Sequence, residues 1–233
     1  TPVIRWAGSF PDARFAPPGP SALRRVWNAI VGIEPERGDE GPLLKRPFGV
    51  AALENGFAVT DPDARAVLRV NWREASLAAV NCPNHTWLMP IAVAATSDGV
   101  LFVADGGAGV VVRVELDGQC TRIGAGRLER PTGLAFGSGR LYVVDPPQHQ
   151  VVAFSADGRE QLRFGLGGGE RQALNYPTGV AVAPDGTVLV VDALNFRVVR
   201  FTPEGKYLDE FGQSGDGGGA FGRPKGIAVD SAG

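Results

Sequence analysis

The sequence is poor in the residues that most often carry out chemistry. Its 233 residues include two histidines and two cysteines. Two histidines cannot supply a three-histidine zinc site, and they leave few candidates for general acid–base catalysis. No Ser/His/Asp or Cys/His arrangement follows a catalytic motif. We therefore expect no cofactor and no metal site, and a non-catalytic protein is favoured while an enzyme stays open as the alternative.

Charge of one sign and long apolar runs are also lacking. The formal net charge is −2 with a pI of about 5.7, and the 20 arginines and 3 lysines are scattered. A nucleic-acid partner requires a basic face, so none is expected. No run of 18 apolar residues occurs, and no membrane span is predicted. The chain is 44% hydrophobic, and at this length a compact fold buries roughly 70–75% of the surface of the unfolded chain.

The stretch 177–212 has the pattern of four short antiparallel strands. Its runs of β-branched and aromatic residues lie between turns rich in Pro, Gly, Asn and Asp. These runs are 180–182, 188–191, 197–201 and 207–211. The pattern predicts a four-stranded meander.

The same unit recurs along the chain. A Pro-x-(Gly/Ala)-apolar opening occurs at Pro47, Pro90, Pro131, Pro177 and Pro224, with spacings of 43, 41, 46 and 47 residues. Each complete unit has an aspartate 14 or 15 residues after this proline, namely Asp61, Asp105, Asp145 and Asp192. A period of this length with four strands predicts the blade of a β-propeller. We expect an all-β fold with four full blades and the first strand of a fifth.

Residues 1–46 lie outside the repeat, and residues 47–233 form the predicted propeller. A strand is expected at 3–8, then a proline-rich loop, then a helix at 22–31. The hypothesis is that about two further blades follow residue 233, giving six in all. The N-terminal strand would then close the ring by pairing with the last blade.

The pattern P-x-G-V-A-V-x-x-D-G-x-x-x-V-x-D-A-x-N-x-R-V, taken from Pro177 onward, resembles the NHL repeat. The N-terminal layout is similar to that of bacterial six-bladed NHL-type propellers, many of which are exported. The resemblance implies an extracytoplasmic location, and a start at Thr1 agrees with a removed leader. It further implies a protein partner, conceivably an exported redox protein or a cell-surface complex. The NHL pattern places Arg five residues after the aspartate, where only Arg197 matches, so irregular second turns are predicted in the other blades.

The repeat pattern predicts different roles for two groups of residues. The repeated aspartates Asp61, Asp105, Asp145 and Asp192 are interpreted as structural, accepting hydrogen bonds from the turn that follows. Loops predicted to emerge on one face carry a candidate binding rim, composed of Arg65, His85, His149, Asn195 and Arg197. For the histidines, a solvated surface position without a ligand is favoured over this binding role. Trp72 and Trp87 form either an exposed recognition patch or part of the core.

The two cysteines, Cys82 and Cys120, are not spaced as metal ligands. In the repeat they fall near opposite ends of outer strands in neighbouring units. This placement favours two free thiols over a disulfide, although the sequence leaves the pairing open.

The favoured function is a non-catalytic protein-binding or scaffold propeller of an exported or cell-surface assembly. The alternative is a propeller enzyme, a lactonase-like hydrolase or an amidating-lyase-like protein with a metal in the central channel. That alternative requires Asp, Asn, Glu or His side chains that converge on the channel from several blades.

Overall fold

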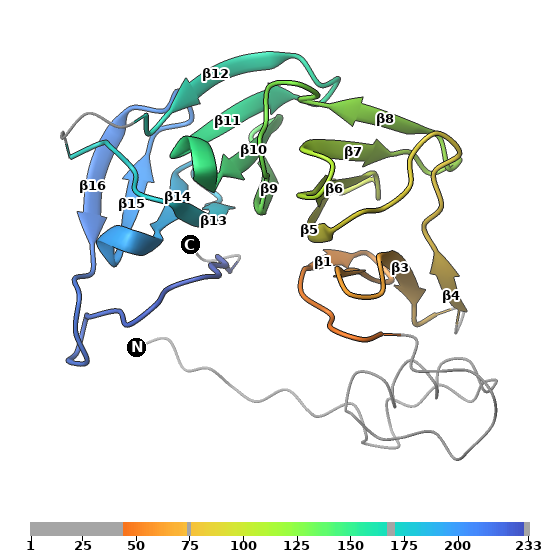
Figure 1. Ribbon diagram of the computed structural model, residues 1–233, viewed down its shortest axis with the longest axis horizontal. Coiled ribbons are helices and arrows are strands. Elements are labelled where there is room, and N and C mark those ends of the chain that lie inside the picture. The colour runs from red at the N-terminus through yellow and green to blue at the C-terminus, as the bar shows by residue number, and fades with distance from the viewer. Residues whose placement is uncertain (1–43, 74–75, 167–170, 231–233) are drawn as a thin grey trace.

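The computed structural model describes residues 44–73, 76–166, 171–230. Four four-stranded antiparallel sheets follow one another around a common axis, and each is a meander whose strands lie in chain order (Figure 1). The predicted all-β propeller with four full blades is confirmed. The strand, helix and ring closure predicted for residues 1–46 lie almost wholly outside the described residues.

In each blade the first strand along the chain is the innermost and the fourth is the outermost (Figure 1). Blade 1 contains β1 (Val50–Leu53), β2 (Gly56–Asp61), β3 (Ala66–Asn71) and β4 (Ser76–Ala79). Blade 2 contains β5 (Pro90–Ala95), β6 (Leu101–Asp105), β7 (Val110–Val114) and β8 (Cys120–Ile123). Blade 3 contains β9 (Gly133–Gly137), β10 (Arg140–Asp145), β11 (Gln150–Ser155) and β12 (Glu160–Phe164). Blade 4 contains β13 (Pro177–Val182), β14 (Val188–Asp192), β15 (Arg197–Phe201) and β16 (Tyr207–Phe211). Single turns of 3-10 helix, η1 (Pro146–Gln148) and η2 (Ala193–Asn195), follow β10 and β14.

The core lies between the blades because each middle strand is covered on both faces. In β6, Leu101 and Val103 pack toward blade 1, whereas Phe102 packs toward blade 3 and stacks on Phe136 with ring centroids 5.4 Å apart. All five residues of β6 are buried. A strand buried on both faces has a continuous apolar sequence rather than an alternating one. This explains runs such as Val110–Val112, which an amphipathic edge strand would not have.

Glycine near the start of the innermost strand, in blades 1, 3 and 4, lets neighbouring blades approach closely. A Cβ atom at Gly133 would lie 2.9 Å from the carbonyl oxygen of Thr178 in the next blade, and one at Gly49 would lie 2.7 Å from the carbonyl oxygen of Ile91. Both obstacles are backbone atoms, which cannot rotate away. Blade 2 has Ala92 at the corresponding position.

The fifth opening, 224–227, lies beside β13 but is not a strand. Thr178 Oγ1 donates a hydrogen bond of 3.1 Å to the carbonyl oxygen of Lys225. A Cβ atom at Gly179 would lie 2.8 Å from that oxygen, which repeats the relation between Gly133 and Thr178. The segment therefore takes the place of a fifth innermost strand. An innermost strand pairs with the second strand of its own blade, and among the described residues no strand follows 224–227.

The outer strands β8, β12 and β16 carry charged side chains, which discourage edge-to-edge association. On β12, Glu160 accepts hydrogen bonds from Arg163 Nε at 2.6 Å and from Arg127 Nη1 at 2.8 Å. These two guanidinium groups, Arg163 foremost, lower the pKa of the Glu160 carboxyl to about 2.

We expect Gly133→Ala to lower the free energy of unfolding by about 1 to 3 kcal/mol, because the added Cβ forces two blades apart. Ala92→Gly is the matched control and should cost about 0.5 to 1 kcal/mol through backbone entropy alone. Urea denaturation measures both. Equal losses would show that close approach at Gly133 is unimportant.

We expect the stabilising effect of Glu160 to depend on pH. Its folded pKa is about 2, below the ordinary value of 4.5. The contribution is therefore complete above about pH 4.5 and is lost as the pH falls toward 2. Glu160→Gln should cost about 0.5 to 1 kcal/mol at neutral pH and progressively less below pH 4.5. In an Arg127→Ala/Arg163→Ala background the substitution should have little effect; a loss that persists there would contradict the ion-pair explanation.

Candidate functional site

A fully buried aspartate ends the second strand of every blade. Its carboxylate accepts hydrogen bonds from backbone N–H groups of the connection that leads into the same blade. The donors are Lys45 and Arg46 to Asp61, Leu88 and Met89 to Asp105, Glu129 and Arg130 to Asp145, and Asn175 to Asp192, at 2.5 to 2.9 Å. We call this arrangement the aspartate clamp. Hydrogen bonds from the following turn, as predicted, also reach Asp61 from Ala64 N and Asp105 from Ala108 N.

A buried apolar residue precedes the first donor of each clamp and anchors the connection. These residues are Leu44, Trp87, Leu128 and Leu174, all between 3% and 6% exposed. Each stands three residues before an opening proline, so the repeat contained the signal that sequence reasoning missed. The exposed recognition patch considered for Trp87 is wrong, since its ring is in the core and its Nε1–H donates to the carbonyl oxygen of Val80 at 2.8 Å. Trp72 is 42% exposed, with its ring 6.3 Å from that of Phe57.

The turn after each aspartate shares one backbone feature in all four blades. The residue four positions after the aspartate is left-handed, with φ of +52° at Arg65, +65° at Gly109, +53° at His149 and +55° at Phe196. Arg65 is therefore the counterpart of His149 and not a displaced copy of Arg197. The irregular second turns predicted for blades that lack the arginine are not observed.

In blade 4, two residues of the predicted rim complete the clamp instead of facing a ligand. Arg197 Nε donates to Asp192 Oδ2 at 2.7 Å, and its Nη2 donates to the carbonyl oxygen of Ala173 at 2.8 Å. Asn195 Nδ2 donates to the same carboxylate oxygen at 2.9 Å. The carboxylate is thus held by side chains of its own blade.

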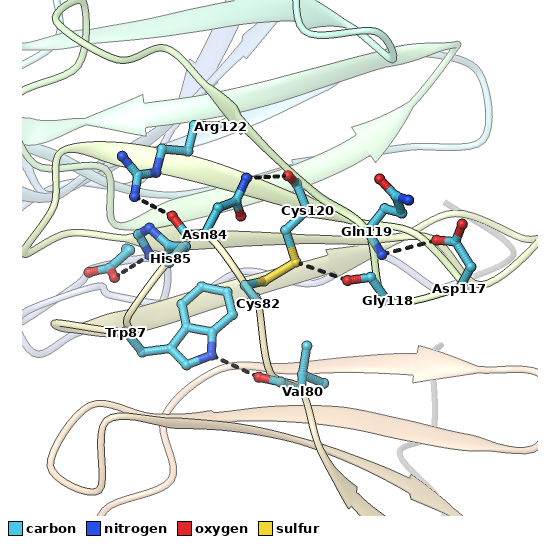
Figure 2. The surroundings of a disulfide bond; sticks show 11 residues. Val80, Cys82, Asn84, His85, Trp87, Asp117, Gly118, Gln119, Cys120 and Arg122 are labelled. Carbon is cyan, nitrogen blue, oxygen red and sulfur yellow. Dashed lines mark hydrogen bonds and ion pairs between the residues drawn. A yellow bond between two sulfur atoms is a disulfide. The ribbon is translucent and has the colours of Figure 1, made fainter.

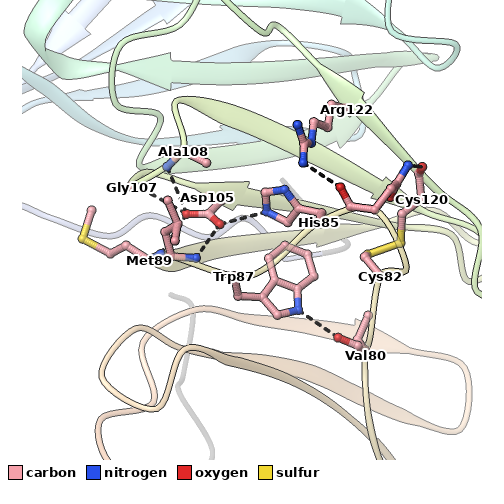
Figure 3. A network of polar contacts seen from close by, with 12 residues as sticks. Val80, Cys82, His85, Trp87, Met89, Asp105, Gly107, Ala108, Cys120 and Arg122 are labelled. Carbon is pink, nitrogen blue, oxygen red and sulfur yellow. Dashed lines mark hydrogen bonds and ion pairs between the residues drawn. A yellow bond between two sulfur atoms is a disulfide. The ribbon is translucent and has the colours of Figure 1, made fainter.

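In blade 2, His85 takes over this role. Val110 stands where blade 4 has Arg197, and the imidazole Nε2 of His85 lies 2.9 Å from Asp105 Oδ2 (Figure 3). The carboxylate oxygen accepts, so Nε2 is the donor. His85 is 8% exposed, and its ring meets that of Trp87 edge to face with ring centroids 4.9 Å apart. His85 therefore lies beneath the predicted rim, and a solvated surface position is wrong for it.

Cys82 and Cys120 form a disulfide, which corrects the preference for two free thiols. Their Cα atoms are 5.6 Å apart, a normal spacing for a bridge. Cys82 lies beyond the end of β4, and the connection between blades 1 and 2 carries it to the start of β8 (Figure 2). Nearby, Asn84 Nδ2 donates to the carbonyl oxygen of Cys120 at 3.1 Å, and Arg122 Nη2 donates to that of Asn84 at 2.6 Å.

The rim itself is built from other residues at the same face. His149 is half-buried, and its Nδ1 accepts a 3.1 Å hydrogen bond from the backbone N–H of Tyr176. Arg130 Nη2 donates to the hydroxyl of Tyr176, with its guanidinium carbon 6.0 Å from the ring centroid. Arg65 is exposed on the equivalent turn of blade 1. Whether His149 and Arg65 bind a ligand stays a prediction.

Exposed apolar side chains continue this surface across blades 2 to 4. Leu88 and Leu194 are 47% and 55% exposed. Met89 and Arg130 flank Gly106, where a Cβ atom would lie 2.9 Å and 3.5 Å from their side chains. The Leu194 N–H donates to the carbonyl oxygen of Asn175, next to Tyr176. We call the resulting surface the rim stripe, composed of Leu88, Met89, Arg130, Tyr176 and Leu194.

No group of three or more His, Cys, Asp or Glu residues able to hold a metal ion occurs in the described part of the chain. Each of the four repeated aspartates already accepts hydrogen bonds from backbone N–H groups. Among the residues that the structure describes, no helix is long and apolar enough to cross a membrane.

The chain is similar to one known sequence repeat and to several solved structures. A model of the NHL repeat matches residues 174–201, and no curated protein matches the chain. Virginiamycin B lyase from Staphylococcus aureus is 16% identical with a TM-score of 0.63, and the match covers 78% of this chain and 59% of the lyase. A gluconolactonase from Xanthomonas campestris is 21% identical, with a TM-score of 0.62 over 82% of this chain and 68% of that one. A chain of a nidogen/laminin complex is 18% identical, with a TM-score of 0.65 over 80% and 69%.

These identities show the fold alone, and the chain spans about three fifths of the length of the virginiamycin B lyase that it matches. The neighbours include two enzymes and a protein found in a complex with another protein. The chain is therefore a β-propeller, and the part of it at residues 174–201 matches the NHL repeat.

Proposed function

We propose that the protein is a binding propeller whose rim stripe contacts another protein. The observation that carries this proposal is the stripe: exposed leucines beside a methionine and an arginine–tyrosine pair, spread over three blades of one face. Tyr, Met and Arg are enriched in protein interfaces, and binding energy concentrates in such aromatic and arginine anchors. Because Arg130 carries a positive charge at the centre of an apolar surface, the partner surface should combine apolar side chains with a carboxylate.

The aspartate clamps support this function by holding the stripe in one shape. Leu88 and Met89 donate their N–H groups to Asp105, and Arg130 donates its N–H to Asp145. The side chains of the stripe therefore project from a fixed backbone. A preorganised surface loses less conformational entropy on binding than a loose one.

The disulfide supports a location outside the cytoplasm. Disulfides persist in oxidising compartments and are rare in the cytosol. An extracytoplasmic assembly, with an exported redox protein or a cell-surface complex as partner, is part of the proposal. Nidogen, one of the similar structures, is described in a complex with laminin, so a related fold meets a protein partner in that case.

A complete ring of six blades also belongs to the proposal. At the first blade, Phe48 and Val50 are 58% and 68% exposed, as expected for a face that another blade would cover. At the other end, 224–227 lies beside β13 in the position of a further innermost strand.

We expect Arg130→Ala and Leu88→Ser to weaken partner binding at least about tenfold each, since both remove side chains from the stripe. The experiment captures partners from the extracytoplasmic fraction, identifies them by mass spectrometry, and measures Kd with the purified partner. Matched controls are Arg159→Ala and Leu116→Ser, two exposed positions on hairpins of the opposite face. If the controls weaken binding as much, or if the stripe variants bind normally, the rim stripe is not the binding surface.

A further inference from the structure

The connection between blades 1 and 2, residues 80–89, is held differently from the connection into blade 4. In blade 4, Asn195 and Arg197 satisfy the Asp192 carboxylate from within the blade, and the connection contributes the Asn175 N–H. In blade 2 the corresponding positions are Ala108 and Val110, whose side chains cannot donate.

Consequently, residues 80–89 supply both the side chain that donates to Asp105 and the backbone N–H groups that reach it from the connection. These donors are the imidazole of His85 and the backbone N–H groups of Leu88 and Met89. The anchor Trp87 lies among them and bonds back to Val80 within the same connection. The clamp of blade 2 therefore depends on the connection keeping its own conformation.

The outer end of this connection is tied to β8 by one covalent bond and two exposed hydrogen bonds. The bond is the Cys82–Cys120 disulfide, and the hydrogen bonds join Asn84 to Cys120 and Arg122. Exposed hydrogen bonds compete with water and hold a segment weakly. Cys82 and Cys120 are both partly exposed, so the bridge lies near the surface of the protein.

We propose that the Cys82–Cys120 disulfide is a redox latch on the connection 80–89. In the oxidised state it holds His85 on Asp105 and fixes Leu88 and Met89. A dithiol reductant opens the latch: one of its thiolates attacks a sulfur atom of the disulfide, and its second thiol resolves the mixed disulfide. Two electrons and two protons pass to Cys82 and Cys120, which become thiols, while the reductant becomes a disulfide.

Opening the latch loosens one end of the rim stripe. Leu88 and Met89 are the blade 2 part of that surface, whereas Arg130, Tyr176 and Leu194 lie on loops without a disulfide. The latch thus makes the binding surface complete in an oxidising compartment and incomplete after reduction. This consequence rests on the proposed function, but the conformational change does not.

Hydrogen exchange tests the latch without a partner. In the folded wild-type protein, treatment with dithiothreitol should accelerate exchange of the Leu88 and Met89 amides about tenfold or more, because local opening sets their protection. The Glu129 and Asn175 amides occupy the same place in blades 3 and 4 and should keep their rates. The Cys82→Ser/Cys120→Ser variant should show the fast rates without reductant and should not respond to it.

Unchanged rates for Leu88 and Met89 after reduction would overturn the latch and leave the proposed function untouched. Equal acceleration of Glu129 and Asn175 would also overturn it, since the disulfide would then stabilise the whole fold. Selective acceleration supports the latch even if Arg130→Ala and Leu88→Ser bind partners normally, an outcome that would reject only the rim stripe as the binding surface.

Discussion

A carboxylate with no exposed surface must find donors inside the protein, because an isolated buried charge is very costly. In this propeller the donors are backbone N–H groups of the connection that enters the same blade. The requirement joins three points that are far apart along each blade: the end of the second strand, the connection and the start of the innermost strand. It also fixes the loops of one face. The rim stripe and the position of His85 are consequences of this single electrostatic need.

Much of the architecture could be predicted from the sequence because it is periodic. The same spacing separates the opening prolines (Pro47 and its four counterparts), the repeated aspartates and the apolar middle strands in each unit. A unit with an irregular sequence can therefore be recognised by alignment with the others. Features that occur once could not be found in this way. The disulfide depends on the path of one connection beyond β4, and His85 completes a clamp from a position that has no counterpart in the repeat pattern.

In the candidate site, too, the repeated features could be predicted from the sequence and the features that occur once could not. Residues were assigned to a rim according to the loop that carries them, but a loop position does not determine where a side chain points. Arg197 and His85 turn inward because a buried carboxylate attracts donors more strongly than water does. Arg130 and Tyr176 were missed because they belong to two connections whose conformations are set by Asp145 and Asp192, respectively. All four blades share the aspartate clamp but differ in the side chains that complete it. These differences shape the face of the propeller that carries the rim stripe.

The left-handed turn residue has a further consequence for how such a surface can change. Glycine adopts a positive φ without steric cost. Nevertheless, Arg65, His149 and Phe196 occupy this position, and of the four blades only blade 2 has a glycine there, Gly109. The fold around the buried aspartate imposes the backbone there, so the chemical identity of the side chain is left open. A propeller of this type therefore carries one variable position per blade on an otherwise constant ring, and new recognition can evolve there without any alteration of the scaffold.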